Sequence, residues 1–284
     1  MRKMLIIGML AGAAIVAAEA RAGTRPGFEI GGEVFDYGYR ERLDGDTVAR
    51  DDGTFGGIGV GYVETLRGGW FLRARFNAAW GSVDYRGDGA ILDEDDGDDG
   101  ESRIDDVSQT IGQLELHVGR DFTMAGGTTL TPFIGLGSRV LEDKSGGEVS
   151  DDGLLGYDRE ISYAYVPIGL ASRHPLGGGK VLTLSAQYNW VVGGEAKSNF
   201  SDLDEEVPDV KLDLNDGHGF EASAMLDLPV GSHAVCFGPF LRYWSLGRSD
   251  KLVLTDPDFP GEELQVFEPK NRTTELGIRL AFAF

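Results

Sequence analysis

The sequence predicts an all-β protein, a transmembrane antiparallel up-and-down β-barrel of about ten strands. Three observations predict this fold class. Apolar and polar residues alternate in ten segments, most of them long enough for the 9 to 11 residues with which a tilted strand crosses a bilayer. The links between these segments are alternately tight and long. Beyond the N-terminal segment, no stretch approaches the ~18 consecutive apolar residues of a transmembrane helix.

The N-terminal segment has the three parts of a Sec signal peptide. Arg2 and Lys3 precede a mostly apolar stretch from residue 4 to residue 18, and small residues follow at Ala18, Ala20 and Ala22. An uncleaved anchor helix is the alternative, but the apolar stretch is short for a ~20-residue span. We therefore expect a signal peptide over 1–22 and a barrel domain over 23–284.

Alternation with a period of two residues defines each expected strand. At the C-terminus, Leu276, Ile278 and Leu280 alternate with Gly277 and Arg279, which leaves one face apolar. The same pattern predicts ten strands, over residues 28–41, 54–66, 70–86, 108–122, 128–141, 161–174, 180–194, 217–229, 233–247 and 271–284. Three prolines, Pro132, Pro167 and Pro239, fall inside them, and we expect bulges or strand starts at these positions.

The links carry the topology and almost all of the charge. Those after the second, fourth, sixth and eighth strands are tight, whereas the links after the odd-numbered strands are long and acidic, as in transmembrane barrels with both termini on the short-turn side. The five long links, over 40–53, 86–107, 142–160, 201–216 and 248–270, sum to a net charge of −24, and the rest of residues 23–284 sums to +1. The acidity therefore belongs to one rim.

Composition and residue patterning argue against several classes of protein. With 26 basic and 47 acidic residues the chain has a net charge of −21, which argues against nucleic-acid binding. The single cysteine, Cys236, excludes an internal disulfide. A soluble β-sandwich also has alternating strands, but here aromatic residues such as Trp70, Trp80 and Tyr243 lie near the strand ends on the apolar face, as in an interfacial girdle.

Three segments resemble those of bacterial outer-membrane β-barrel proteins, in particular poorly characterised porin-like and OmpA-like barrels. They are residues 130–137, residues 163–170 and the closing segment 274–284, which ends in phenylalanine. The resemblance implies a multi-pass protein of the bacterial outer membrane, with periplasmic termini and with outer-membrane lipid as its surroundings. It also implies that the outer-membrane assembly machinery reads the closing segment, including Gly277, Phe282 and Phe284.

Alternation also sorts the residues that face the barrel interior. The expected lumen is polar and holds both signs of charge in similar number. We expect it to form a salt-bridged plug, because buried charges persist when paired and the interior of a ten-stranded barrel is narrow. A narrow aqueous pore is the open alternative. The expected lumen residues are Glu29, Glu33, Arg73, Arg75, Gln113, Glu115, His117, Arg139, Tyr163, Tyr165, Arg173, Gln187, Asn189, Glu221, Arg242, Glu275 and Arg279.

Catalysis has one weak candidate. The length and strand count are similar to those of the omptin proteases, and that resemblance would imply an Asp-Asp pair and an Asp-His pair facing each other at the extracellular mouth. The only Asp-x-His is Asp216-Gly217-His218, and the opposing pair would be Asp84 and Asp88, whose spacing departs from the family's alternate spacing. No Ser/His/Asp constellation is evident, so we expect neither an enzyme nor a cofactor.

One acidic run suggests weak binding of divalent cations, because carboxylate oxygens are the ligands of such ions. The run fails the spacing of an EF-hand, and a solvated loop extended by self-repulsion is the plainer interpretation. It comprises Asp93, Glu94, Asp95, Asp96, Asp98, Asp99 and Glu101.

Two functional classes remain open at the level of sequence. The first is a structural or surface-exposed barrel with a plugged lumen. The second is a small diffusion channel whose acidic mouth prefers cations. An omptin-like surface protease is a distant third.

Overall fold

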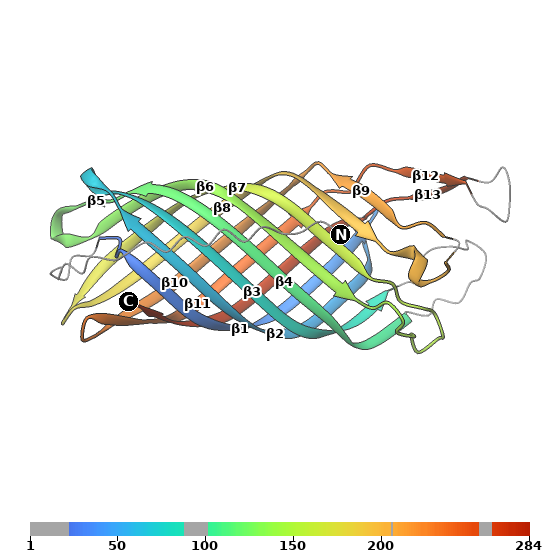
Figure 1. The fold of residues 1–284 in the computed structure, drawn as a ribbon, viewed down its shortest axis with the longest axis horizontal. Helices are drawn as coiled ribbons and strands as arrows, with labels where there is room; N and C mark the ends of the chain where they lie inside the picture. Colours follow the sequence, from blue (N-terminus) through green and yellow to red (C-terminus); the bar gives the residue numbers. More distant parts are fainter. Residues whose placement is uncertain (1–22, 88–101, 206, 256–262) are drawn as a thin grey trace.

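The computed structural model describes residues 23–87, 102–205, 207–255 and 263–284, and it confirms the predicted fold class. Ten long strands form a closed antiparallel barrel (Figure 1). They are β1 (Gly27–Leu43), β2 (Asp46–Thr65), β3 (Trp70–Gly87), β4 (Ser102–Arg120), β6 (Thr129–Lys144), β7 (Arg159–Gly177), β8 (Lys180–Ser198), β10 (Gly217–Val230), β11 (His233–Leu246) and β14 (Lys270–Ala283).

Neighbours in sequence pair with one another, and the last strand pairs with the first. The register of β1 with β14 runs from Glu29 opposite Ala283 to Arg42 opposite Lys270, so the barrel has no free edge. This closure satisfies the edge hydrogen bonds that an open sheet would leave unpaired. It also brings the start of β1 and the end of β14 to the same end of the barrel.

The two ends of the barrel differ. Short turns connect the strands at one end, where the 3-10 turns η1 (Arg67–Gly69) and η2 (Ala125–Gly127) and the two-residue strand β5 (Phe122–Thr123) lie. Longer connections at the other end contain η3 (Phe200–Asp202), β9 (Val210–Leu214) and a hairpin of β12 (Leu252–Thr255) with β13 (Glu263–Val266) (Figure 1). We call these the short-turn end and the loop end.

The first connection at the loop end is not the long link expected over 40–53. Asp44 and Gly45 form a tight turn with positive φ angles of 52° and 108°, and β1 and β2 pair on both sides of it. Asp-Gly is a sequence that favours such a hairpin turn. Charge density suggested a loop here, but the inward side chains Glu41 and Asp51 are buried, so this segment is barrel wall.

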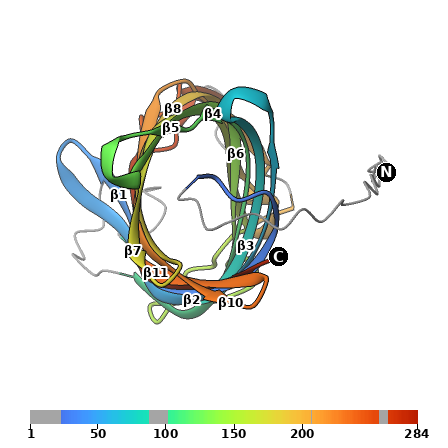
Figure 2. The ribbon, with the colours of Figure 1, turned by 90° about the vertical axis from the view of Figure 1, so that its left-hand side faces the viewer.

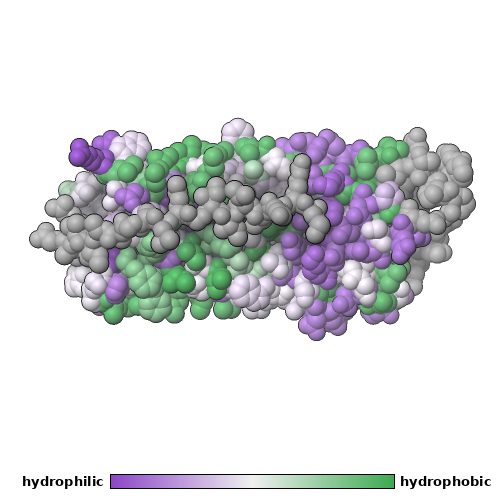
Figure 3. All heavy atoms as spheres, viewed as in Figure 1, coloured by the Kyte–Doolittle hydropathy of each residue, from purple (hydrophilic) through white to green (hydrophobic). Residues whose placement is uncertain are grey.

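The outer surface is divided along the barrel axis. Near the short-turn end, large apolar side chains such as Val34, Ile58 and Ile278 are about half exposed or more, and they form a belt around the barrel (Figure 3). Toward the loop end the surface is hydrophilic (Figure 3). In the part of the chain that the structure describes, no helix is long and apolar enough to cross a membrane.

The three prolines lie within strands, and two of them stand beside interruptions of the ladder. Pro167 of β7 has no register partner on β6, and Pro239 of β11 has none on β10. Pro132 is the fourth residue of β6. Proline has no N–H to donate, which accounts for the missed pairs at the first two positions.

Candidate functional site: the filled barrel interior

A chain of alternating charges crosses the middle of the barrel. Arg279 of β14 pairs with Glu33 of β1 at 2.7 Å, and Glu33 also accepts a hydrogen bond from Arg242 of β11. Arg242 pairs in turn with Glu275 of β14 at 2.6 Å, and Glu275 accepts a further bond from Arg139 of β6. All five side chains point inward because each occupies an inward position of its alternating strand.

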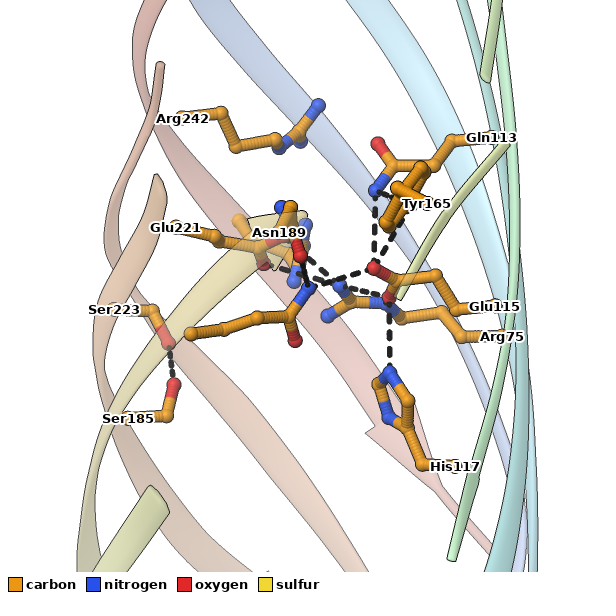
Figure 4. A network of polar contacts seen from close by, with 12 residues as sticks. Arg75, Gln113, Glu115, His117, Tyr165, Ser185, Asn189, Glu221, Ser223 and Arg242 are labelled. Atoms are coloured by element: carbon orange, nitrogen blue, oxygen red, sulfur yellow. Dashed lines mark hydrogen bonds and ion pairs between the residues drawn. The ribbon is translucent and has the colours of Figure 1, made fainter. Parts of the chain in front are cut away.

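A second group of charges centres on Arg75 of β3. Its guanidinium lies 2.6 Å from Glu115 of β4 and 3.0 Å from Glu221 of β10, so it links opposite walls of the barrel (Figure 4). Glu115 also accepts hydrogen bonds from Tyr165 at 3.0 Å and from Gln187 at 2.8 Å. Every face of this carboxylate is therefore occupied by protein.

The positive and negative charges of the two groups together are equal in number. They contain four arginines and four glutamates, and Glu115 and Glu275 are fully buried. Charges buried to this extent persist only with partners, since desolvation costs several kcal/mol per ion. A cavity beside Glu33, Arg75 and Arg279 has a volume of about 20 Å³, which is room for about one water molecule.

Aromatic and aliphatic side chains fill the barrel on the loop side of the ion pairs. Trp244 packs edge-on against Tyr163 and Tyr165, with ring centroids 5.1 and 4.9 Å apart, and Phe35 stacks on Phe55 at 5.4 Å. Further out lie Val83, Ile104, Val107, Ile111, Leu141, Ile161, Val191, Leu212, Leu214 and Leu246, all of them buried. The sequence analysis placed Tyr163 and Tyr165 in the lumen but missed the apolar residues of this core, because it sorted the interior for polar side chains only.

Glycines make room for these rings. A Cβ atom at Gly137 would lie 2.3 Å from the ring of Tyr165, and one at Gly219 would lie 2.4 Å from the ring of Trp244. Both distances are far below van der Waals contact. Part of the high glycine content therefore accommodates aromatic rings inside a narrow barrel.

The ion pairs and the rings are joined by cation–π contacts. The guanidinium of Arg242 lies 4.3 Å from the ring centroid of Phe240, and that of Arg279 lies 5.1 Å from the same ring. Arg139 lies 5.5 Å from the ring of Trp244. Desolvated contacts of this kind contribute up to about 2 kcal/mol each.

A third polar group lies beyond the apolar core, at the loop end. The amide of Gln109 donates to both Asp51 and Asp143, at 2.8 and 2.7 Å. Nearby, Arg159 pairs with Glu41 at 2.5 Å.

Glu268 belongs to the same loop-end group and precedes β14. Its carboxylate accepts a hydrogen bond from Tyr39 at 3.3 Å. Burial, and then the Glu41 carboxylate, raise the pKa of Glu268 to about 7.

The start of the described chain lies at the opposite end, inside the short-turn mouth. Figure 2 looks into the barrel from that end, and the blue first segment lies within the ring of strands. Thr24 donates to the Asp121 carboxylate through its hydroxyl at 2.9 Å and through its backbone amide at 2.5 Å. Asp121 also accepts a bond from Thr131 and pairs with Arg173 at 3.4 Å. This segment covers part of the mouth.

The expected lumen residues His117, Arg73 and Glu29 have fewer close polar contacts than the two ion-pair groups. His117 is buried, with its Nε2 atom 3.6 Å from the Glu115 carboxylate (Figure 4). Arg73 lies over the ring of Phe71 at 5.3 Å. Within the described ranges, Glu29 and Arg73 form no ion pair with any residue.

The residues considered for proteolysis do not face each other. His218 lies on the outer face of β10, where its ring is 6.2 Å from that of Tyr188 and parallel to it within 12°. Asp84 is exposed on the outer face of β3, 4.0 Å from Arg103. Asp88 and the acidic run of Asp93 to Glu101 lie outside the described residues. Within the described ones, no group of three or more His, Cys, Asp or Glu side chains is arranged to hold a metal ion.

The residues considered as an assembly signal end the last strand. Phe282 and Phe284 are about half exposed on the outer face. Gly277 faces inward, where a Cβ atom would lie 2.4 Å from Cβ of Phe35.

No protein-family model and no curated protein sequence matches this chain. Among solved structures, the outer membrane protease OmpT from Escherichia coli is similar in fold, with 12% identity, coverage of 91% of this chain and 97% of that chain, and a TM-score of 0.57. The outer membrane protein OprG from Pseudomonas aeruginosa also matches, with 12% identity, coverage of 93% of this chain and 100% of that chain, and a TM-score of 0.38. The beta domain of the Bordetella autotransporter BrkA matches with 13% identity, coverage of 90% of this chain and 99% of that chain, and a TM-score of 0.39. Both TM-scores are too low to add to the argument. The chain thus has the fold of bacterial outer-membrane β-barrel proteins.

Proposed function

We propose that this protein is a closed barrel of the bacterial outer membrane, with a structural role and with its acidic loops displayed at the cell surface. The observation that carries the proposal is the filled interior. Four arginines and four glutamates occupy the middle of the lumen, and a core of buried rings and aliphatic side chains lies on their loop side. A lumen packed in this way leaves little space for a solute.

The orientation follows from the asymmetry of the ends. We infer that residues 1–22 are a signal peptide, that the short-turn end faces the periplasm and that the loop end faces outward, as is usual for such barrels. The closing segment with Phe282 and Phe284 would then be read by the outer-membrane assembly machinery. The acidic loops would lie where divalent cations are available, and loose binding of such ions there is part of the proposal.

A small cation-preferring diffusion channel is the alternative. It requires a continuous water path past Arg75 and Arg242, and both are engaged with carboxylates from two strands. Proteolysis is less well supported, because Asp84 and His218 both lie on the outer face rather than on facing walls of the mouth.

Swelling of proteoliposomes distinguishes the closed barrel from a channel wide enough to admit a small sugar. Liposomes containing the folded, heat-modifiable protein should swell in isosmotic arabinose no faster than protein-free liposomes. A variant with Trp244→Gly and Tyr165→Gly, which removes two of the largest interior rings, should swell faster if it folds. Rapid swelling with the unmodified protein would refute the proposal.

A further inference from the structure

Two buried aspartates share one side-chain amide at the loop end of the lumen. Asp51 of β2 and Asp143 of β6 are 1% and 5% exposed, and Gln109 of β4 is 2% exposed. The Nε2 atom of Gln109 lies 2.8 Å from Oδ2 of Asp51 and 2.7 Å from Oδ2 of Asp143. A neutral amide therefore bridges two carboxylates. We call these three residues the Asp-Gln-Asp site.

Three oxygen atoms of the Asp-Gln-Asp site have no hydrogen-bond donor among the described residues. They are Oδ1 of Asp51, Oδ1 of Asp143 and Oε1 of Gln109, and all three are buried. The buried hydroxyl of Tyr37 also lacks a described partner, and it interacts electrostatically with Asp51. Buried acceptors without a donor are rare in folded proteins, and a bound ion is one of the arrangements that satisfies them.

Negative charge exceeds positive charge around this site. Glu41 and Glu268 are buried in the same loop-end group, where Arg159 pairs with Glu41. In the described part of the chain, four buried carboxylates therefore face one guanidinium. The three internal stretches outside the described residues contain neither lysine nor arginine. Because buried charges persist only with partners, the positive charge that compensates the two aspartates comes from the solvent, as a proton or as a cation.

The oxygen atoms of the site suit calcium. Calcium binds carboxylate and side-chain amide oxygens at about 2.3–2.6 Å and accepts irregular geometry. The Nε2 atom of Gln109 already lies within 2.8 Å of both carboxylates, so a cation in its place would contact both. A half-turn of the amide about its last side-chain bond exchanges the nitrogen for Oε1 and adds a third oxygen ligand.

We propose that Asp51, Asp143 and Gln109 bind one calcium ion at the loop end of the lumen. The ion neutralises the two aspartates and ties β2, β4 and β6 together, so it stabilises the barrel wall beside the loops. A proton held by the two aspartates is the competing arrangement. The inference does not depend on whether the lumen conducts, and the site is separate from the acidic run of Asp93 to Glu101.

The test is a titration of the full protein with calcium chloride, read by isothermal titration calorimetry. The protein is refolded in detergent and stripped of metal with a chelator. The variant D51N/D143N removes both carboxylates, keeps the shape of their side chains and leaves every loop carboxylate in place. Its matched control, E142Q/E160Q, removes two carboxylates that lie opposite each other on β6 and β7, at outward positions of the same wall.

A second measurement follows unfolding in urea. Each protein is unfolded in calcium chloride and in sodium chloride of equal ionic strength, so that screening of the acidic loops is the same in both. A calcium ion bound to the folded state should raise the urea midpoint of the unmodified protein and of the control variant, but not that of D51N/D143N.

We expect D51N/D143N to weaken calcium binding by about tenfold or more, and the control variant to change it by less than about twofold. Gln109→Glu supplies a third carboxylate and should tighten calcium binding by about threefold or more, which tests the site even if D51N/D143N does not fold. Equal calcium binding by the unmodified protein and D51N/D143N would overturn the proposal. A urea midpoint that responds to pH but not to calcium would also overturn it, in favour of the proton.

Discussion

Replacing Glu275 by glutamine tests the charge chain at its most buried carboxylate. Glu275 is fully buried and holds both Arg139 and Arg242, and Arg242 keeps Glu33 as a second partner. Among the described residues, Arg139 has no carboxylate partner other than Glu275, and its Nη1 atom already lacks a hydrogen-bond partner. The substitution therefore leaves one buried guanidinium uncompensated, which typically costs 3–5 kcal/mol, or about two to four orders of magnitude in the folding equilibrium.

The assay is denaturant unfolding of the detergent-refolded barrel, followed by tryptophan fluorescence. Trp244 lies 5.5 Å from the Arg139 guanidinium, so one of the four tryptophans that contribute to the emission lies at the site itself. The double variant Glu275→Gln/Arg139→Met removes both charges and should recover at least about 2 kcal/mol relative to additivity. The control is Lys211→Gln, which breaks an exposed ion pair of 2.9 Å with Glu195 and should cost less than about 1 kcal/mol. An equal loss of unfolding free energy in Glu275→Gln and in Lys211→Gln would refute the reasoning.

Three further predictions concern the two ends and the second ion-pair group. Arg75→Ala should lower the free energy of unfolding by about 3 kcal/mol, because it leaves two glutamates facing each other, and an unchanged midpoint would contradict this. Because burial raises the pKa of Glu268 to about 7, the folded state keeps a proton that the unfolded state loses, so stability should fall as pH rises from about 4.5 to 7. Glu268→Gln should make that slope shallower and be more stable than the parent at pH 8 by about 1–3 kcal/mol; identical pH profiles of the two proteins would count against it. Asp121→Asn should free the first segment from the mouth and speed hydrogen exchange of the Thr24 backbone amide, which donates to Asp121, and equal exchange rates would show that Asp121 does not hold it.

The architecture could be predicted from sequence because a barrel strand with an apolar outer face and a polar inner face leaves a strict period of two. The strand expected over 271–284 is Lys270–Ala283 in the structure, and the strand expected over 70–86 is Trp70–Gly87. Errors concentrate at the loop end, where outward residues are polar and the apolar half of the alternation is lost. The Asp44-Gly45 hairpin is the clearest case, since acidic residues there belong to the barrel wall.

The interior was only partly predictable. Alternation assigns Glu33, Arg242 and Glu275 to the lumen, but it cannot say which charges meet, because that depends on the tilt and stagger of the whole barrel. Arg75 and Glu221 are 146 residues apart and belong to strands on opposite walls. The aromatic core is indicated in the sequence by the inward series Phe35, Tyr37 and Tyr39 of β1, which polar residues alone do not reveal.

Single-channel recording in a planar bilayer tests the closed lumen most directly. The account predicts no conductance steps from folded, heat-modifiable protein in symmetric salt, because the ion-pair chain and the core around Trp244 fill the middle of the lumen in the part of the chain that the structure describes. The Trp244→Gly/Tyr165→Gly variant serves as the positive comparison. Stable cation-selective steps from the unmodified protein would contradict the account and would identify the protein as a channel.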